Sequence, residues 1–85
     1  MSVLHFRVDD EGNIINVSYD SSTTARNFML DFLNKHTNYA TLDKEVYTFQ
    51  CNGKILNSNK YIDIKIKELI RENGLVRLFK KQNIY

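Results

Sequence analysis

The segment from residue 46 to residue 79, VYTFQCNGKILNSNKYIDIKIKELIRENGLVRLF, constrains the fold of this 85-residue chain more than any other part. Aromatic and apolar residues alternate with polar ones over residues 47–51, which predicts a strand with one buried face. Asn52-Gly53 follows and is a strong signal for a two-residue hairpin turn. Residues 54–56 then predict a short return strand.

Residues 60–72 have two interpretations. Their first half alternates like a strand. The same segment also carries apolar residues at helical spacing, namely Ile62, Ile66, Leu69 and Ile70. Because Asn73-Gly74 is a typical helix stop, we predict an extended segment, a short helix over residues 64–72 and a final strand over residues 75–81. Only a few small folds close a sheet with this order of elements.

The final strand has a side-chain pattern that assigns its two faces. Arg77 is a poor core residue, so Val76 and Leu78 are predicted to point inward. Leu75, Arg77 and Phe79 then point outward. A central strand that exposes Leu and Phe beside Arg has the composition enriched at protein interfaces. The alternative is that the connector before the third strand, or the C-terminal tail, folds over these outward residues.

The first half of the chain predicts a hairpin followed by a helix. Residues 3–8 and 14–19 alternate in apolar character, and the acidic segment between them ends in Gly12-Asn13, which tolerates the positive φ of a bulged turn. Ser and Thr at residues 21–24 supply N-cap candidates. One apolar stripe follows at helical spacing: Ala25, Phe28, Met29, Phe32, Leu33 and His36. Leu30 is off this stripe and is expected to be partly exposed.

The helix is expected to end at His36. Lys35 and His36 would place positive charge in its last turn, where such charge complements the helix dipole. Residues 37–45, TNYATLDKE, then form a connector to the third strand. Tyr39 and Leu42 are apolar residues of this connector, and we expect both to pack against the core. The role of residues 37–45 is not set by the sequence.

Residues 47–56, YTFQCNGKIL, resemble the ubiquitin-like superfamily. They are similar to ubiquitin's third strand, its aromatic-x-Gly-Lys-x-Leu turn and its short fourth strand. Residues 66–79 are similar to the later short helical segment, polar turn and closing strand. The resemblance implies an α+β fold, the ubiquitin-like β-grasp. It has ββαββ order, a mixed sheet of strand order 2-1-5-3 packed on one helix, and a short second helix.

The resemblance and the residue pattern agree on how the layers are built. The first and last strands would pair in parallel, which needs a long crossover that the helix supplies. The inward face of the sheet needs one covering layer, and a helix is available. The predicted core consists of inward apolar residues: Leu4, Phe6, Val8, Ile15, Val17, Phe28, Phe32, Phe49, Leu56, Ile66, Leu69, Val76 and Leu78.

The chain departs from ubiquitin at positions that carry ubiquitin's chemistry. Conjugated modifiers of this fold end in Gly-Gly, whereas this sequence ends KKQNIY, so the resemblance implies that the chain is not conjugated. Ubiquitin's hydrophobic recognition patch lies on the outer face of strands three and five and in the first hairpin loop. This chain has Gln50, Arg77 beside Phe79, and acidic residues 9–11 at those places. We therefore expect that ubiquitin receptors do not recognise it.

Composition and length exclude several broad classes. The chain is 42% hydrophobic and 26% charged, which is ordinary for a folded protein, and its length suits a single domain over residues 1–85. A net charge of +2 is weak for a nucleic-acid binder. No apolar run approaches the ~20 residues of a membrane span, and the N-terminus lacks a secretory pattern. Together with the single cysteine, these features predict an intracellular protein, cytoplasmic or nuclear.

No residue pattern predicts an enzyme, a metal site or a cofactor. Cys51 alternates in phase with the buried face and has no evident activating base, so it is interpreted as a core residue. His5 and His36 are on different elements and lack ligand spacing. Acidic residues 9–11 lack the spacing of a calcium loop, and Asn52-Gly53-Lys54 is too short for a phosphate loop.

The function that the sequence predicts is non-covalent protein–protein interaction, as an adaptor or a small subunit of a larger assembly. The alternative is a ubiquitin-like modifier or a sulfur-carrier-like protein, which the missing Gly-Gly disfavours. The predicted binding residues are those expected on the outer sheet face: His5, Arg7, Thr48, Gln50, Leu75, Arg77 and Phe79. Neither a membrane nor a nucleic acid is an expected partner. The identity of the protein partner and the oligomeric state are not set by the sequence.

Basic residues are concentrated in the C-terminal half of the chain: Lys60, Lys65, Lys67, Arg71, Arg77, Lys80 and Lys81. Glu68 and Glu72 dilute this charge. The plain interpretation is a solvated face, and the first alternative is an acidic protein partner. A nucleic acid is the last alternative, because no platform of aromatic and basic residues for base stacking is evident.

Overall fold

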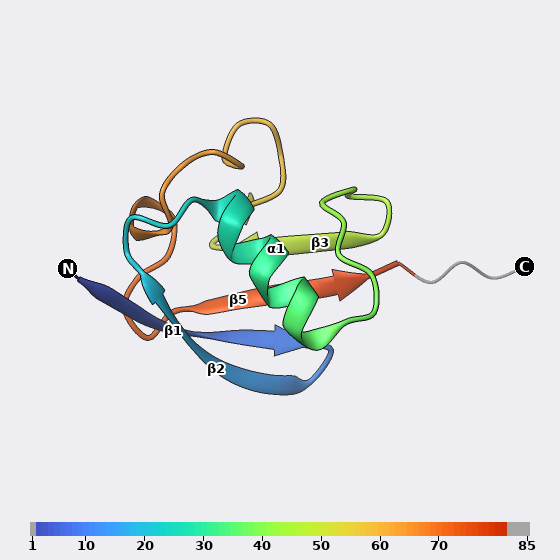
Figure 1. Ribbon diagram of the computed structural model, residues 1–85, viewed down its shortest axis with the longest axis horizontal. Helices are drawn as coiled ribbons and strands as arrows, with labels where there is room; N and C mark the ends of the chain where they lie inside the picture. Colours follow the sequence, from blue (N-terminus) through green and yellow to red (C-terminus); the bar gives the residue numbers. More distant parts are fainter. Residues whose placement is uncertain (1, 82–85) are drawn as a thin grey trace, which may run out of the picture.

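The computed structural model describes residues 2–81 of the chain and is drawn in Figure 1. The elements in chain order are β1 (Val3–Asp10), β2 (Asn13–Asp20), α1 (Ala25–His36), β3 (Tyr47–Cys51), β4 (Lys54–Ile55), the 3-10 helix η1 (Ile66–Glu68) and β5 (Leu75–Lys80). This is the predicted order ββαββ with a short helical turn before the last strand. The residues after Lys81, on which the expectation about conjugation depends, lie outside the described part.

The strands form one mixed sheet in the order β2-β1-β5-β3-β4, and α1 lies across one of its faces (Figure 1). β1 and β5 pair in parallel at the centre, with Arg7 opposite Leu75 and Val8 opposite Val76. The β1–β2, β3–β5 and β3–β4 pairs are antiparallel. The predicted order 2-1-5-3 is therefore confirmed, and β4 extends the sheet beside β3.

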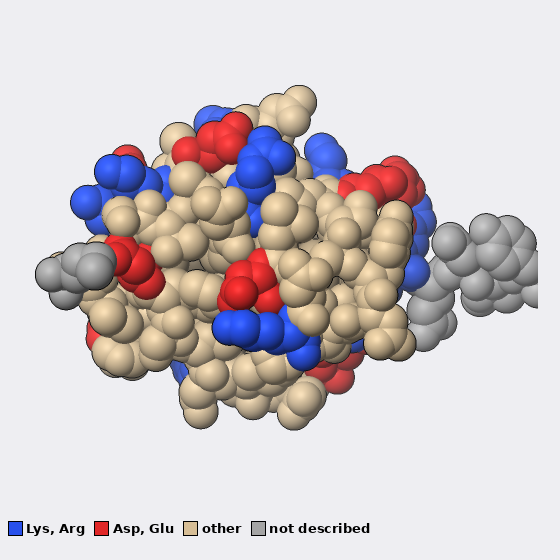
Figure 2. Space-filling view, viewed as in Figure 1, with Lys and Arg blue, Asp and Glu red and all other residues tan. Residues whose placement is uncertain are grey.

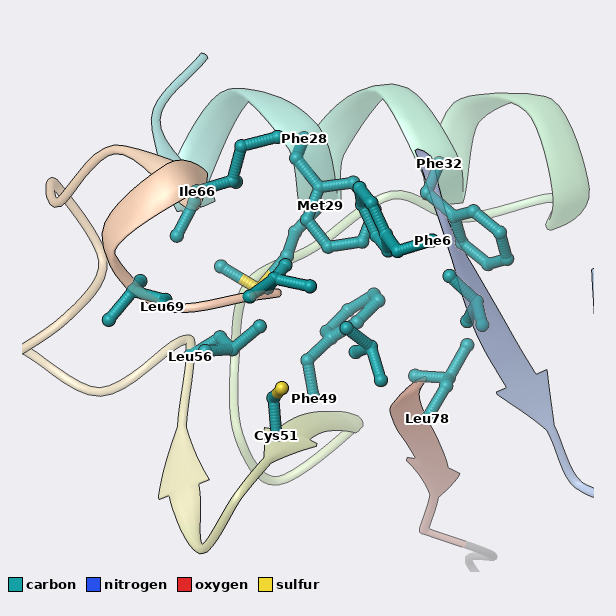
Figure 3. Packing of buried hydrophobic residues seen from close by; sticks show 14 of the residues in the cluster. Phe6, Phe28, Met29, Phe32, Phe49, Cys51, Leu56, Ile66, Leu69 and Leu78 are labelled. Carbon is teal, nitrogen blue, oxygen red and sulfur yellow. The ribbon is translucent and has the colours of Figure 1, made fainter. Parts of the chain in front are cut away.

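The core lies between α1 and the inner face of the sheet (Figure 3). Phe28 and Phe32 of α1 and Phe49 of β3 are fully buried there, and their rings meet edge to face or at a tilt. Every residue of the predicted core contributes to it. Ile15 and Val17 do so as partly buried residues, because β2 is an edge strand with no further strand beyond it.

Both hairpins turn through two residues with left-handed backbone conformation. Asn52-Gly53 has φ values of 51° and 76°, which confirms the turn predicted there. In the first hairpin the turn residues are Glu11-Gly12, with φ values of 52° and 94°. The expectation that Asn13 shares this turn is wrong, because Asn13 pairs with Asp10 as the first residue of β2.

Helix α1 begins and ends with side-chain caps. The Asn27 N–H donates to the hydroxyl of the N-cap residue Thr24 at 3.2 Å, which satisfies one of the free amides of the first turn. At the other end, the Thr37 hydroxyl donates to the Leu33 carbonyl at 2.6 Å. The helix ends at His36 as predicted, and Leu30 is half-buried, as its place off the apolar stripe indicated.

The second helix is shorter than predicted. Only Ile66–Glu68 forms a single 3-10 turn, in place of the helix expected over residues 64–72. The start of α1 holds the segment before this turn, because the Ala25 N–H donates to the Ile64 carbonyl at 2.8 Å and the next amide of α1 bonds to the same segment. A longer helix would need that carbonyl for its own first turn.

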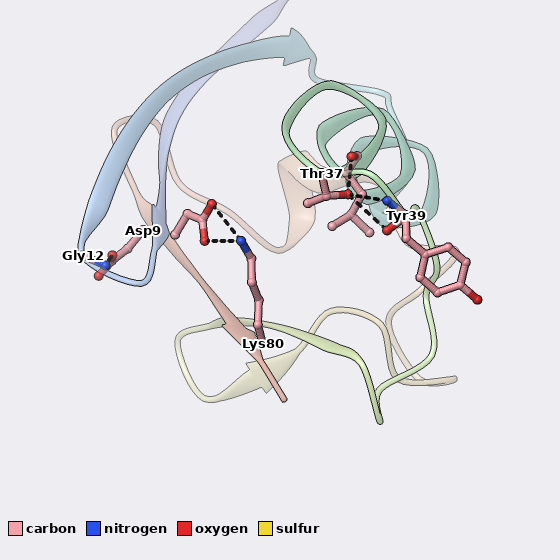
Figure 4. Close-up of polar contacts among 7 residues, drawn as sticks. Asp9, Gly12, Thr37, Tyr39 and Lys80 are labelled. Carbon is pink, nitrogen blue, oxygen red and sulfur yellow. Dashed lines mark hydrogen bonds and ion pairs between the residues drawn. The ribbon is translucent and has the colours of Figure 1, made fainter. Parts of the chain in front are cut away.

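The connector, residues 37–45, packs through one of its two predicted residues. Leu42 is partly buried against the core, and its carbonyl accepts a hydrogen bond from the buried Asn57 amide at 3.2 Å. The expectation for Tyr39 is wrong, since this residue is 63% exposed and its ring points away from α1 (Figure 4). Thr37 contacts the Tyr39 backbone, with its Oγ1 accepting from the Tyr39 N–H at 3.4 Å and lying 3.1 Å from the Tyr39 carbonyl oxygen.

Candidate protein-interaction face

The seven residues predicted to bind a partner all lie on the side of the sheet opposite α1. The alternation of side chains along a strand places them there, because the neighbours of Arg77 in β5, Val76 and Leu78, are buried under α1. We use the term outer face for the surface formed by His5, Arg7, Thr48, Gln50, Leu75, Arg77 and Phe79. The inward and outward assignments made for β5 are therefore confirmed.

Strand pairing makes the outer face one continuous surface. β5 is its middle strand, with β1 on one side and β3 on the other. The cross-strand pairs that form it are Arg7 with Leu75, Gln50 with Arg77, and Thr48 with Phe79. Directly opposite residues on one face of an antiparallel pair have Cβ atoms about 4.5–5.5 Å apart, so Gln50 and Arg77, and likewise Thr48 and Phe79, are immediate neighbours.

Leu75, Arg77 and Phe79 differ in exposure along β5. Phe79 is 49% exposed and Arg77 is exposed, while Leu75 is half-buried. Phe79 is therefore not covered by the connector, residues 37–45, and that part of the alternative is wrong; the C-terminal tail beyond Lys81 lies outside the described residues. The exposed part of the Phe79 ring can therefore pack against another molecule.

Arg77 is the charged residue at the centre of the outer face. Its cross-strand neighbour Asp9 turns its carboxylate toward the hairpin, where Oδ1 accepts from the Gly12 N–H at 2.7 Å (Figure 4). Within residues 2–81, Arg77 takes part in no ion pair. A shallow hollow of about 340 Å³ beside it is lined in part by Gln50 and Leu75. The guanidinium is thus available to a carboxylate of another molecule.

Three of the predicted residues are engaged inside the chain. The His5 N–H donates to Glu72 Oε1 at 2.8 Å, and its Nδ1 lies 3.1 Å from Glu72 Oε2. Arg7 donates through a guanidinium N–H to the Asn73 carbonyl at 3.2 Å. The Thr48 hydroxyl donates to the Lys44 carbonyl at 3.3 Å. These residues form the border of the outer face and hold the loops beside it.

The contact between His5 and Glu72 makes stability depend on pH. The donated His5 backbone N–H, and then its side chain, hold the pKa of Glu72 below its ordinary value. This stabilisation is therefore complete above the unfolded pKa of about 4.3 and is lost as pH falls through the lower folded pKa. We expect Glu72→Gln to be less stable than the native chain in urea at neutral pH.

The difference between the two proteins should narrow as the pH falls below the lowered pKa of Glu72 in the folded chain, where this carboxyl is protonated in both states. Glu11→Gln is the matched control, since Glu11 is exposed in the hairpin turn and its carboxylate accepts no hydrogen bond from the described residues. A gap between the native chain and Glu72→Gln that stays constant with pH would contradict this account.

Sequence reasoning missed two apolar residues that extend the outer face. Ile14 is 50% exposed and pairs with Asp9, and Ile55 of β4 pairs with Gln50. Through these pairs, one row crosses the sheet from Ile14 to Ile55 with Arg77 at its middle. The alternation of β2 already placed Ile14 outward, but the row is visible only once the strand register is known.

The described residues contain little that suggests catalysis. Cys51, the last residue of β3, is buried in the core, as predicted. Burial raises the pKa of its thiol, so the reactive thiolate is disfavoured. No group of three or more His, Cys, Asp or Glu side chains within residues 2–81 is placed to hold a metal ion. Nor does that part of the chain include a helix long and apolar enough to cross a membrane. On the α1 side, acidic and basic side chains are interspersed (Figure 2).

Comparison with solved structures finds ubiquitin-like domains. The ubiquitin-like domain of an Arabidopsis thaliana protein aligns with 98% of this chain and 82% of its own, with a TM-score of 0.71 and 17% identity. The UBL domain of yeast Ddi1 aligns over 98% of this chain and 94% of its own, with a TM-score of 0.67 and 17% identity. A designed protein based on human erythrocytic ubiquitin covers 100% of this chain and 98% of its own, at a TM-score of 0.64 and 12% identity.

No protein-family model matches the sequence, and no curated protein matches it. The likeness is therefore one of architecture: the same sheet order, the same parallel central pair and the same covering helix over nearly the whole chain. At identities of 12–17%, this likeness establishes the fold and leaves the specific role to be argued from the residues. The chain has the ubiquitin-like β-grasp fold.

Proposed function

We propose that this chain is a non-covalent protein–protein interaction module that binds its partner through the outer face. The observation that carries the proposal is the arrangement on β5, where Arg77 has no ion-pair partner within residues 2–81 and is flanked by the exposed ring of Phe79. Aromatic residues and arginine are the residues that most often dominate binding energy at protein interfaces. Binding by an adaptor or a small subunit of a larger assembly needs no chemistry beyond this.

Binding would place Leu75 and Phe79 in an apolar groove of the partner, with Arg77 paired to a carboxylate at the centre. β5 lies between two other strands, so its backbone is already held in the bound geometry. Little conformational entropy is then lost when the partner docks, which favours affinity. His5, Arg7 and Thr48 would contribute mainly by keeping the border of the face in place.

The test is affinity purification from cells that express the chain, comparing the native protein with Leu75→Ala, Arg77→Glu and Phe79→Ala. Truncating a central anchor of this kind costs about 2 kcal/mol of binding free energy. Phe79→Ala should therefore lower the affinity for a purified partner about thirtyfold. Arg77→Glu should weaken binding as well, because it places a negative charge against the partner's carboxylate. Binding is measured by isothermal titration calorimetry once a partner is in hand.

Lys60→Glu is the matched control, because it makes the same charge change at an exposed residue outside the outer face. Each variant is first checked by urea unfolding, which should change little because the replaced side chains are exposed or half-buried. If the variants Leu75→Ala, Arg77→Glu and Phe79→Ala each retain every protein that the native chain retains, the outer face is not the binding surface.

A further inference from the structure

A second hollow, of about 460 Å³, lies at the end of the sheet nearest the first residue of β5. β5 pairs with β1 only from Arg7 onward and with β3 only as far as Gln50. Beyond those points, Leu4 of β1 and Asn52 of the β3–β4 turn have no strand between them. The segment that carries η1 borders this space instead, and none of the seven residues of the outer face lines it.

The rim of this hollow carries more positive than negative charge. Lys54, Lys67 and Arg71 line it from two separate segments, and none of them forms an ion pair within the described residues. Both glutamates on the rim, Glu68 and Glu72, carry negative charge at neutral pH, so three cations face two carboxylates among the described lining residues. The rim is therefore complementary to an anionic ligand.

The basic residues of the C-terminal half thus separate into different roles. Lys80 pairs with Asp10 at 3.1 Å, and Lys81 pairs with Glu45 (Figure 4 shows the Lys80 contact). Their charges are balanced within the chain. Lys67 and Arg71 remain unbalanced by any ion pair among the described residues, and they lie together with Lys54 around one concave surface.

The floor of the hollow favours a protein ligand over a nucleic acid. Leu4 and Leu69 line it and, although both are largely buried, keep 8% and 6% of their surface exposed, which offers a small apolar contact to a ligand side chain. None of the described lining residues is aromatic, so bases would find no ring to stack on. An apolar floor within a basic rim matches a peptide in which a leucine-like side chain is flanked by carboxylates.

We infer that this hollow binds an acidic segment of a partner protein, whose carboxylates pair with Lys54, Lys67 and Arg71 while one apolar side chain rests on Leu4 and Leu69. The site is separate from the outer face and goes beyond the function proposed above. Asn52 lines both hollows, so the two surfaces meet at the β3–β4 turn. One partner could occupy both, with a folded part on the outer face and an acidic tail in this hollow.

The experiment is a titration of the isotope-labelled chain with the peptide Ac-EELEE-NH2, followed by two-dimensional NMR at low salt. The amides of Lys54 and of residues 67–71 should shift, and the apparent affinity should fall as salt is added. The peptide Ac-QQLQQ-NH2, which keeps the leucine and removes the charge, should cause no such shifts. The double variant Lys67→Glu/Arg71→Glu should bind the acidic peptide at least about tenfold more weakly.

Lys44→Glu is the matched control, because Lys44 is exposed on the connector and does not line the hollow. Arg77→Glu should leave the peptide titration unchanged, which separates this inference from the one about the outer face. Equal shifts with the glutamine peptide, or equal affinity of the double variant and the native chain, would overturn the inference. So would tighter binding of a short oligothymidylate at the same amides with a steep salt dependence, which would mark a nucleic-acid site instead.

Discussion

Replacing Phe28 with alanine should lower the free energy of unfolding by about 3–5 kcal/mol. The Phe28 ring is fully buried and lies 5.1 Å from the rings of Phe6 and Tyr19 and 5.9 Å from the ring of Phe49, centroid to centroid. It therefore joins β1, β2 and β3 to α1. A chain of this size has a total stability of about 5–10 kcal/mol, so the variant should be close to unfolding at room temperature.

Urea unfolding followed by circular dichroism measures this loss. Phe79→Ala is the matched control, since it removes the same side chain from an exposed position, and it should change stability by less than about 1 kcal/mol. The same control also shows that the variant used for binding is folded. If Phe28→Ala and Phe79→Ala lose the same stability, the packing described for the core is wrong.

Asn57→Ala is expected to cost about 3 kcal/mol, although it removes no apolar group. Asn57 is the only polar residue that is buried among the described residues. Its Oδ1 accepts from the Phe49 N–H at 3.2 Å, and its Nδ2 donates to the carbonyls of Tyr47 at 2.9 Å and Leu42 at 3.2 Å. Without the amide, buried backbone groups of β3 would lose their hydrogen-bond partners, which costs the free energy of their desolvation.

The structural reason is the shortness of β4. After Ile55 no further strand runs beside β3, and the Asn57 side chain supplies hydrogen bonds that a longer strand would have made with its backbone. Asn59→Ala, at an exposed position in the same loop, should change the urea midpoint very little. Asn57→Asp is a second variant, because it keeps the size but loses both donated bonds. Near-native stability of Asn57→Ala would show that water replaces the amide without cost.

Much of the fold could be predicted because its signals are local. Asn52-Gly53 specifies its turn with two residues, and alternation over residues 47–51 and 75–81 assigns inward and outward sides. Features set by distant contacts could not be predicted in the same way. The pattern of residues 64–72 allows a helix, but the start of α1 competes for the Ile64 carbonyl, and only a 3-10 turn remains. Local propensity carries no information about that contact.

The same division holds for the candidate sites. The period of a strand is enough to place Leu75, Arg77 and Phe79 on one face. It does not show that the Asp9 carboxylate bonds to the hairpin turn and forms no ion pair with its neighbour Arg77, because that depends on the geometry of the turn. Lys67 and Arg71 were visible only as part of a basic half. Lys67 and Arg71 lie around one hollow because β5 begins beside Arg7 and leaves the start of β1 unpaired on that side. This position depends on the register between β1 and β5.

The central place of β5 has a consequence for how the chain forms the outer face during synthesis. β5 is made after the other four strands of the described residues, yet it lies between β1 and β3, which have no direct pairing with each other. A nascent chain that ends before Leu75 therefore has two separate hairpins, β1–β2 and β3–β4, with no strand to pair them. The long-range pairing that closes the sheet comes last. The outer face does not exist in such a chain. A partner that recognises Arg77 and Phe79 side by side with Gln50 and Thr48 thus binds only molecules that have completed folding.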